Sequence, residues 1–180
     1  MGSRSKLGPK PLGLSEVPSG ARILIDSNIF IYHFTDISSE CTQFLERCER
    51  GEVLGVTGVH LLLEVLHRLM MIEAVVEGLV SPGGVARKLR ERPEVVRKLH
   101  RYQEQVGMIP EMGIEVLPIE VELVELSRRY REEHGLLVND SLTLALAEEL
   151  GLEGLATADE DLLRLEGKLP FRLYAPQDLG

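Results

Sequence analysis

The stretch ILIDSN at residues 23–28 places a carboxylate directly after a run of branched apolar residues. An apolar run of this length predicts a buried β-strand that ends at Ile25. Asp26 follows the strand, and apolar residues resume after Asn28. Taken alone, Asp26 would cap the next helix, because a carboxylate accepts hydrogen bonds from the free N–H groups of a first helical turn. Whether it has a second role depends on the acidic residues elsewhere in the chain.

The composition indicates a folded, acidic protein. The 180 residues are enough to bury a core without disulfide or metal crosslinks. Twenty Lys and Arg against 29 Asp and Glu give a net charge of −9, which argues against binding polyanions through bulk charge. Cys41 and Cys48 share one helix face and indicate free thiols, so we expect a cytoplasmic protein. We expect neither a signal peptide nor a membrane span, which needs about 18 apolar residues.

Short apolar runs alternate with helical patterns along most of the chain. We expect strands at residues 22–26, 53–58, 114–119 and 154–159, with another near 172–175. The longest helical pattern starts at Val59 and is apolar on nearly every side, so it should be largely buried. The strands are not joined by Asn-Gly hairpin turns, which favours parallel pairing through helical crossovers. The predicted fold class is α/β.

Two segments differ in composition from the rest. Residues 1–20 are rich in Gly, Pro and Ser and predict a flexible N-terminal leader. Residues 21–180 have the size of a single domain. Within that domain, residues 87–101 contain seven Lys and Arg but only two acidic side chains, and they form the basic region of an acidic chain.

Three more acidic side chains stand at positions comparable to that of Asp26. Asp159 ends the apolar run LATAD, and Asp140 stands at the polar start of a helical pattern, where it complements the helix dipole. Glu64 lies in LLLEVLHRLMM, where either Arg68, four residues on, or a bound cation would neutralise it. Two strand ends, one helix start and one mid-helix position can all face the same end of a parallel sheet.

Such a gathering of carboxylates points to metal chemistry. In a partly desolvated crevice, carboxylates repel one another and become protonated unless cations lie between them. Their oxygens suit Mg²⁺ or Mn²⁺, ions that activate water and stabilise the oxygens of a phosphodiester under attack. The residues therefore predict metal-dependent hydrolysis of a nucleic-acid backbone. The spacing of His60 and His67 around Glu64 is not HExxH, so we expect these histidines to serve in packing or to support the metal ligands.

Four motifs give the sequence a resemblance to the PIN-domain ribonucleases, the family that includes the VapC toxins of prokaryotic toxin–antitoxin pairs. The resemblance runs over about residues 22–175 and rests on ILIDSNIFIYHF, VTGVHLLLEVLHRL, VNDSLTLALAEELG and LATADEDLLRL. It implies a three-layer α/β/α fold with a central parallel sheet of four or five strands. It also implies an endoribonuclease that leaves 5′-phosphate and 3′-hydroxyl ends, with Mg²⁺ or Mn²⁺ held by Asp26, Glu64, Asp140 and Asp159.

Further residues follow from the resemblance and its departures. Asn28 and Thr157 would support the metal ligands, and Asp161 would either support Asp159 or replace it. Residues 80–112 are longer than in compact toxins of the family and predict a helical insertion that alters substrate access or pairing. Its basic side chains either form a solvated helix face or contact RNA, the candidates being Arg87, Lys88, Arg97, Lys98 and Arg101.

The partners that the resemblance implies are an RNA substrate, an antitoxin that covers the acidic crevice, and a second copy in a homodimer. Two alternatives remain open at this point. One is a non-catalytic α/β module that binds RNA or protein through its basic face. The other is a nuclease that processes RNA without any antitoxin.

Overall fold

The computed structural model describes residues 9–179 and contains one parallel sheet between two layers of helices. The strand order is β1-β6-β5-β2-β3-β4, and every neighbouring pair is parallel. The strands are β1 Leu12–Gly13, β2 Arg22–Ile25, β3 Leu54–Gly58, β4 Glu115–Leu117, β5 Gly154–Ala156 and β6 Arg172–Ala175. The predicted α/β fold with a parallel sheet is confirmed, although the sheet has six strands where four or five were expected.

The additional strand lies in the segment that was expected to be a leader. Leu12 pairs with Tyr174 of β6, and Leu14 and Val17 are buried against the core. The leader prediction is therefore corrected for this part of residues 1–20, while residues 1–8 lie outside the described range. The Gly- and Pro-rich composition predicted flexibility, but two buried apolar side chains and one long-range strand pairing are enough to order this segment.

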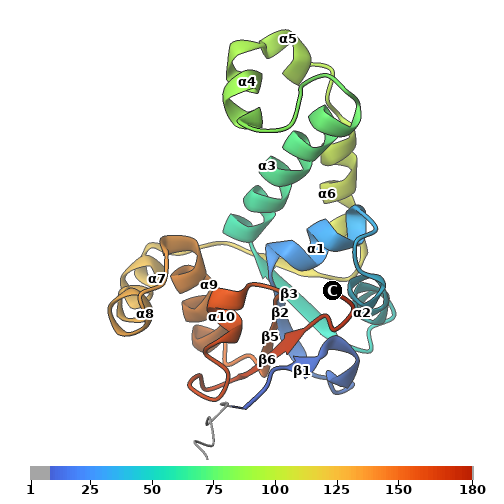
Figure 1. Cartoon of the computed structure of the whole chain (residues 1–180). Coiled ribbons are helices and arrows are strands. Elements are labelled where there is room, and N and C mark those ends of the chain that lie inside the picture. The colour runs from blue at the N-terminus through green and yellow to red at the C-terminus, as the bar shows by residue number, and fades with distance from the viewer. Residues whose placement is uncertain (1–8, 180) are drawn as a thin grey trace, which may run out of the picture.

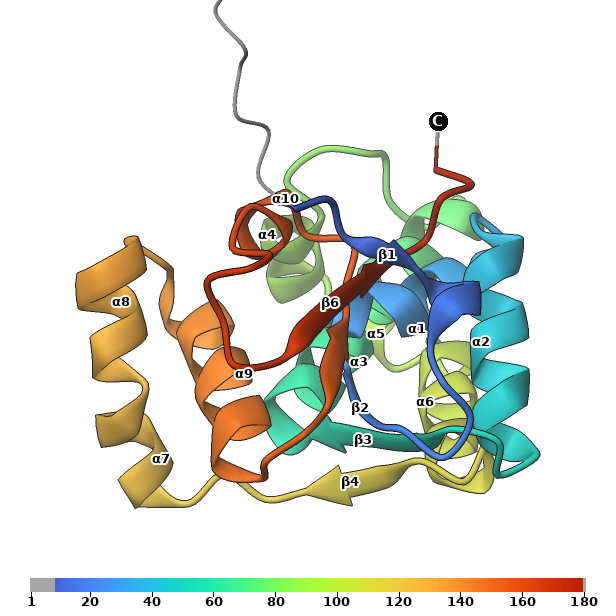
Figure 2. The ribbon, with the colours of Figure 1, turned by 90° about the horizontal axis from the view of Figure 1, so that it is seen from below.

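Helices cover both faces of the sheet (Figure 2). They are α1 Ser27–Phe34, α2 Ser39–Glu49, α3 Val59–Val76, α4 Val85–Glu91, α5 Pro93–Val96, α6 Arg101–Glu111, α7 Val121–Leu126, α8 Arg128–His134, α9 Val138–Glu149 and α10 Glu160–Leu163, with a 3-10 turn at Leu14–Glu16. Successive strand residues point to opposite faces, so Ile23 and Ile25 join one core cluster and Leu24 the other. Among residues 9–179, no helix has the length and apolar character needed to span a bilayer.

Two helical segments are interrupted. Residues 85–109 divide into α4, α5 and α6, and Pro93 begins α5, where its missing N–H costs nothing. Residues 121–135 divide at Ser127, whose hydroxyl donates a hydrogen bond to the carbonyl of Val124 at 2.7 Å.

The longest helix leaves the body of the molecule. α3 and α6 lie side by side and form an arm that projects beyond the sheet, with α4 and α5 at its tip (Figure 1). The expectation that α3 is largely buried is wrong, since its buried residues form a single stripe that faces the core and α6, while His67, Arg68 and Val76 are exposed. An arm of two helices cannot cover the whole circumference of either.

A buried carboxylate fixes the arm. Glu73 of α3 is 6% exposed and accepts hydrogen bonds from the backbone N–H groups of His100, Arg101 and Tyr102 at 3.0, 3.2 and 2.8 Å. These donors lie at the start of α6, where no intrahelical acceptor is available. Glu73 therefore caps α6 from a neighbouring helix and sets the register of the arm.

Replacement of Glu73 by Ala should lower the free energy of unfolding by about 1–3 kcal/mol, because buried N–H donors lose their acceptor. Urea denaturation measures this loss. The matched control is Glu104→Ala, which removes an exposed carboxylate from α6 itself and should change the stability by less than about 0.5 kcal/mol. Equal stability of the two variants would show that Glu73 does not fix the arm.

Candidate metal centre

The four acidic residues singled out in the sequence come from four elements at the carboxyl edge of the sheet. Asp26 follows β2 and is the N-cap residue of α1, while Asp159 follows β5 and is the N-cap residue of α10. β2 and β5 are neighbours, with Ile25 opposite Ala156, so these two strand ends lie side by side. Asp140 lies in the first turn of α9, and Glu64 lies near the start of α3.

Asp26 is held in one orientation by three donors. Its Oδ1 accepts the backbone N–H of Ser27 at 2.7 Å, which confirms the expected cap of α1. Its Oδ2 accepts the hydroxyl of Thr157 at 2.6 Å and the side-chain amide of Asn28 at 3.3 Å. The side chain is only 6% exposed. A capping role therefore does not exclude a further role, because the buried carboxylate is also aimed at β5.

Asn28 and Thr157 join the two strand ends. The side-chain oxygen of Asn28 accepts the N–H of Ala158 at 3.0 Å, and the hydroxyl oxygen of Thr157 accepts the N–H of Asp159 at 3.0 Å. Thr157 thus donates to one acidic residue and accepts from the backbone of another. The two side chains therefore lie between Asp26 and Asp159.

The carboxylates lie close enough to influence one another. Burial, followed by the nearby charges of Glu64 and Asp159, raises the pKa of Asp26 to about 6, although the hydrogen bonds from Thr157 and Ser27 oppose this rise. Burial raises the pKa of Asp140 to about 6 as well, with further contributions from Asp159, Glu64 and Asp161. Five carboxylates therefore share one electrostatic field, those of Asp26, Glu64, Asp140, Asp159 and Asp161.

Protein cations do not neutralise this field. Across residues 9–179, the only ion pair made by one of the five carboxylates is that of Asp161 with Arg164, at 3.6 Å. The expected alternative partner of Glu64 was Arg68, and no such pair forms between them in the described structure. The negative charge at this edge of the sheet is therefore left for something other than Lys or Arg to balance.

The chemistry of the donors fits a hard divalent cation, since every candidate ligand is a carboxylate oxygen. Within residues 9–179, no three acidic, His or Cys side chains lie close enough together in this arrangement to bind one metal ion. Asp26 is fixed by its donors, and Asp159 Oδ1 accepts the N–H of Asp161 at 2.8 Å, whereas Glu64 and Asp140 are partly buried and make no side-chain hydrogen bond within residues 9–179. The set fits the ion by its chemistry and needs side-chain rotation to complete the geometry.

A histidine–threonine contact links the helices that carry Glu64 and Asp140. His60 Nε2 lies 3.0 Å from the hydroxyl of Thr143, and that hydroxyl donates to the carbonyl of Asn139 at 2.9 Å. The hydroxyl is therefore an acceptor for His60, so Nε2 carries the proton. Burial lowers the pKa of His60 to about 4, which keeps the ring neutral. His60 therefore packs α3 against α9 through a hydrogen bond to Thr143.

The sequence assigned no role to Thr143 and suggested Arg131 only as a candidate RNA contact. In the structure the Arg131 guanidinium donates to the hydroxyls of Ser127 and Ser141 at 2.7 and 2.9 Å. Ser141 follows Asp140 directly, so Arg131 anchors the start of α9. The available signal was spacing: Thr143 stands three residues after Asp140, and His60 stands four before Glu64. It did not say that α3 and α9 would touch.

Replacement of Asp26 by Asn should stabilise the metal-free protein at pH 7.5 by about 1–3 kcal/mol, because it removes a buried charge. The folded-state pKa of about 6 exceeds the usual 3.8, so the wild type loses stability as the pH rises through this window. The advantage of the variant should therefore be absent near pH 3.5 and complete above pH 7. Urea denaturation at several pH values, with the exposed Glu46→Gln as control, measures it; a variant less stable than wild type at pH 7.5 would contradict the account.

Comparisons with known proteins agree with this architecture. The sequence model of the PIN domain family matches residues 23–168. Ribonuclease VapC2 of Methanocaldococcus jannaschii is 24% identical over 147 residues, which cover 81% of this chain and 89% of that protein.

Three solved structures share the fold. A toxin–antitoxin complex from Klebsiella pneumoniae has a TM-score of 0.50 and 24% identity over 77% of this chain and 88% of its own. VapBC2 from Rickettsia felis, bound to a promoter DNA fragment, has a TM-score of 0.53 and 14% identity, covering 86% and 98%. PAE2754 from Pyrobaculum aerophilum has a TM-score of 0.52 and 15% identity over 92% of each chain. The resemblance inferred from the four motifs is confirmed: the chain belongs to the PIN domain family.

Proposed function

We propose that this protein is a metal-dependent endoribonuclease and that Asp26, Glu64, Asp140 and Asp159 hold Mg²⁺ or Mn²⁺. The observation that carries the proposal is the shared field of these carboxylates, which protein cations within residues 9–179 leave unbalanced. Membership of the PIN domain family and similarity to a protein named a ribonuclease support it. A non-catalytic binding module would gain nothing from carboxylates gathered at a cost in stability.

Bound Mg²⁺ or Mn²⁺ would supply Lewis-acid stabilisation of the phosphodiester and lower the pKa of a water molecule. The chain's own residues prepare this site. Thr157 and Ser27 orient the Asp26 carboxylate, and Asn28 fixes the distance between the two strand ends. The His60–Thr143 contact holds the helix of Glu64 against the helix of Asp140. The fixed carboxylate of Asp26 would then bind the cation together with those of Glu64, Asp140 and Asp159, which are partly buried.

The biological role that we propose is that of a toxin of the VapBC type. The relative named Ribonuclease VapC2, one neighbour described as a toxin–antitoxin complex and another named VapBC2 support this proposal. An antitoxin would then be the protein partner, a homodimer the assembly, and the cytoplasm the compartment in which RNA is met. Expression of the chain with the product of a small adjacent gene should suppress cleavage if that product is the antitoxin. Retained cleavage with every such product favours an RNA-processing nuclease.

Addition of Mn²⁺ to the metal-free wild type should raise its melting temperature by several degrees, because a ligand that binds only the folded state stabilises it. Asp26→Asn should show little of this increase and should lower the rate of RNA cleavage by about 100-fold or more. Differential scanning fluorimetry and a cleavage assay with structured RNA measure the two effects, with Glu46→Gln as the matched control. Full activity of Asp26→Asn would remove Asp26 from the site.

Asp159 and Asp161 compete for the fourth position, and parallel Asn substitutions separate them. Asp159 is partly buried beside Thr157, whereas Asp161 is exposed and paired with Arg164. Cleavage should therefore fall by more than about tenfold in Asp159→Asn and by less than about threefold in Asp161→Asn. The reverse order, measured as single-turnover rates at saturating Mn²⁺, would assign the fourth ligand to Asp161.

A further inference from the structure

The tip of the arm carries a concentration of positive charge on a chain whose net charge is −9. Residues 87–101 contain seven Lys and Arg and two acidic side chains. The basic side chains lie on α4, on either side of α5 and at the start of α6, at the end of the arm away from the sheet (Figure 1). Charges that are merely solvated need no such segregation, and the rest of the molecule is correspondingly more acidic.

Two of the basic side chains serve the fold, and a third lines a cavity. The Lys88 ammonium donates to the carbonyl and hydroxyl of Ser81 at 3.0 and 2.8 Å and so closes the turn before α4. Arg92 donates to the carbonyl of Leu79 at 2.8 Å and pairs with Glu94. Arg101 lines a cavity together with Glu73, at the side of the arm near α1. Lys88 and Arg101 are among the candidates for RNA contact, and within residues 9–179 only Lys88 of these two is held by local hydrogen bonds of its side chain.

The remaining four are available to a partner. Arg87, Arg90, Arg97 and Lys98 are exposed, and within the described range none of them lies within ion-pair distance of a carboxylate. The backbone of the tip is anchored by the core, since Leu89, Val95 and Leu99 are at most 5% exposed and join the core cluster on that face of the sheet. The four unpaired cations are therefore presented on an ordered part of the backbone.

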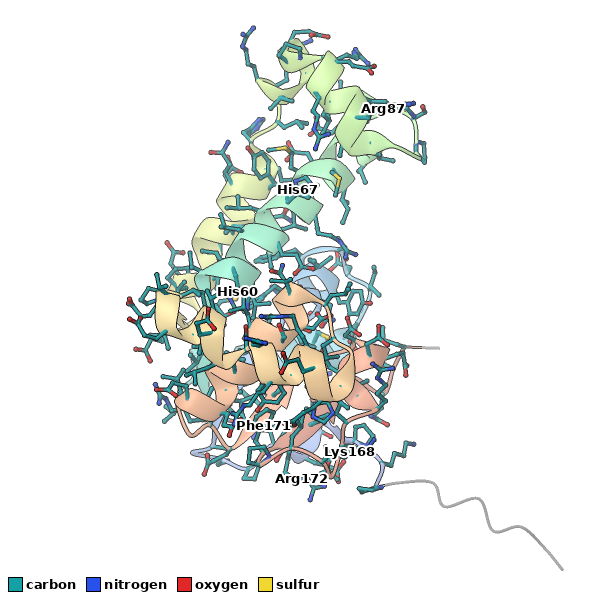
Figure 3. All side chains as sticks on the ribbon, turned by 90° about the vertical axis from the view of Figure 1, so that its left-hand side faces the viewer. His60, His67, Arg87, Lys168, Phe171 and Arg172 are labelled. Carbon is teal, nitrogen blue, oxygen red and sulfur yellow. The ribbon has the colours of Figure 1, made fainter. Side chains whose placement is uncertain are left out.

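The arm connects this surface to the carboxylates. His60, Glu64 and His67 lie on one face of α3, because residues three and four apart are neighbours on a helix. In Figure 3 His60, His67 and Arg87 follow one another from the base of α3 to the tip, on the side of the molecule where α7, α8 and α9 lie. The carboxylate site and the basic tip therefore lie on the same side of the molecule, at opposite ends of α3.

The distance between the carboxylate site and the tip defines the substrate. Val76, at the end of α3, stands twelve residues beyond Glu64, or about 18 Å along the helix at about 1.5 Å per residue. A stacked strand advances about 3.4 Å per nucleotide, so the tip lies about five nucleotides from the carboxylates. Phosphates, rather than bases, suit a surface made of Arg and Lys at the end of a bare helix pair.

We propose that Arg87, Arg90, Arg97 and Lys98 bind backbone phosphates of the substrate RNA about five or more nucleotides from the cleaved bond. This rests on the proposed endoribonuclease function and adds to it a requirement for long or structured RNA. The tip supplies affinity through phosphate contacts, and the carboxylate site supplies the chemistry. A strand too short to reach the tip binds only at the carboxylates, where the chain repels it in the absence of a cation.

The test compares Arg87→Gln/Lys98→Gln with the control Lys10→Gln/Lys168→Gln, which changes the net charge equally. Lys168 lies at the opposite end of the molecule from Arg87 (Figure 3), and both control side chains are exposed. RNA binding is measured in EDTA, where cleavage is absent, with a hairpin of about 30 nucleotides and a strand of about four. The tip variant should lose at least about fivefold in affinity for the hairpin, and its slope of log K against log salt should fall by about one. The control should match the wild type, and the short strand should not distinguish the variants.

Cleavage in Mn²⁺ supplies the second readout. The tip variant should have a raised KM for the hairpin, an unchanged kcat, and unchanged stabilisation by Mn²⁺. Equal losses in the tip and control variants would assign binding to bulk charge and overturn the proposal. Unchanged hairpin binding by the tip variant, with lost binding of an acidic protein partner, would overturn it in favour of a protein contact. A tip effect on binding without any cleavage by the wild type would reject the nuclease function and leave the tip as an RNA-binding surface.

Discussion

The structure depends on one constraint: the carboxyl ends of parallel strands meet at the same edge of a sheet, and this chain puts an acidic side chain after two adjacent strands. Helices α3 and α9 bring Glu64 and Asp140 to the same edge. The repulsion and burial that result raise the pKa of both Asp26 and Asp140 to about 6. Like charges gathered without Lys or Arg partners make sense when a cation is part of the folded, working protein.

The surrounding contacts follow from that constraint. A buried carboxylate must have donors, and Asp26 takes them from Ser27, Thr157 and Asn28. Those same donors join α1 to the end of β5, so the hydrogen bonds that make Asp26 tolerable also set the spacing of the site. Glu73 is a second buried carboxylate, and it takes its donors from the backbone at the start of α6. These hydrogen bonds hold α6 against α3 and so support the arm and its basic tip. Buried acids thus organise both ends of the path from the carboxylates to the tip.

Much of the fold and the candidate site could be predicted from local sequence. ILID and LATAD each predict a buried strand that is followed by an acidic residue. Strands separated by helices predict a parallel sheet. What could not be predicted depends on contacts between distant residues. The strand at Leu12 exists through its pairing with β6, and the exposure of α3 reflects its departure from the sheet as an arm. The hydrogen bonds of Lys88 to Ser81 depend on a turn that composition does not reveal.

The central claim is that the four carboxylates share a divalent cation, and its most direct test is a crystal structure of the protein soaked in Mn²⁺, with anomalous scattering recorded at the manganese edge. The account predicts a peak bounded by Asp26, Glu64, Asp140 and Asp159, at about 2.0–2.2 Å from carboxylate oxygens that have rotated toward it. Manganese bound elsewhere, or a saturating soak that leaves this edge of the sheet without a peak, would contradict it.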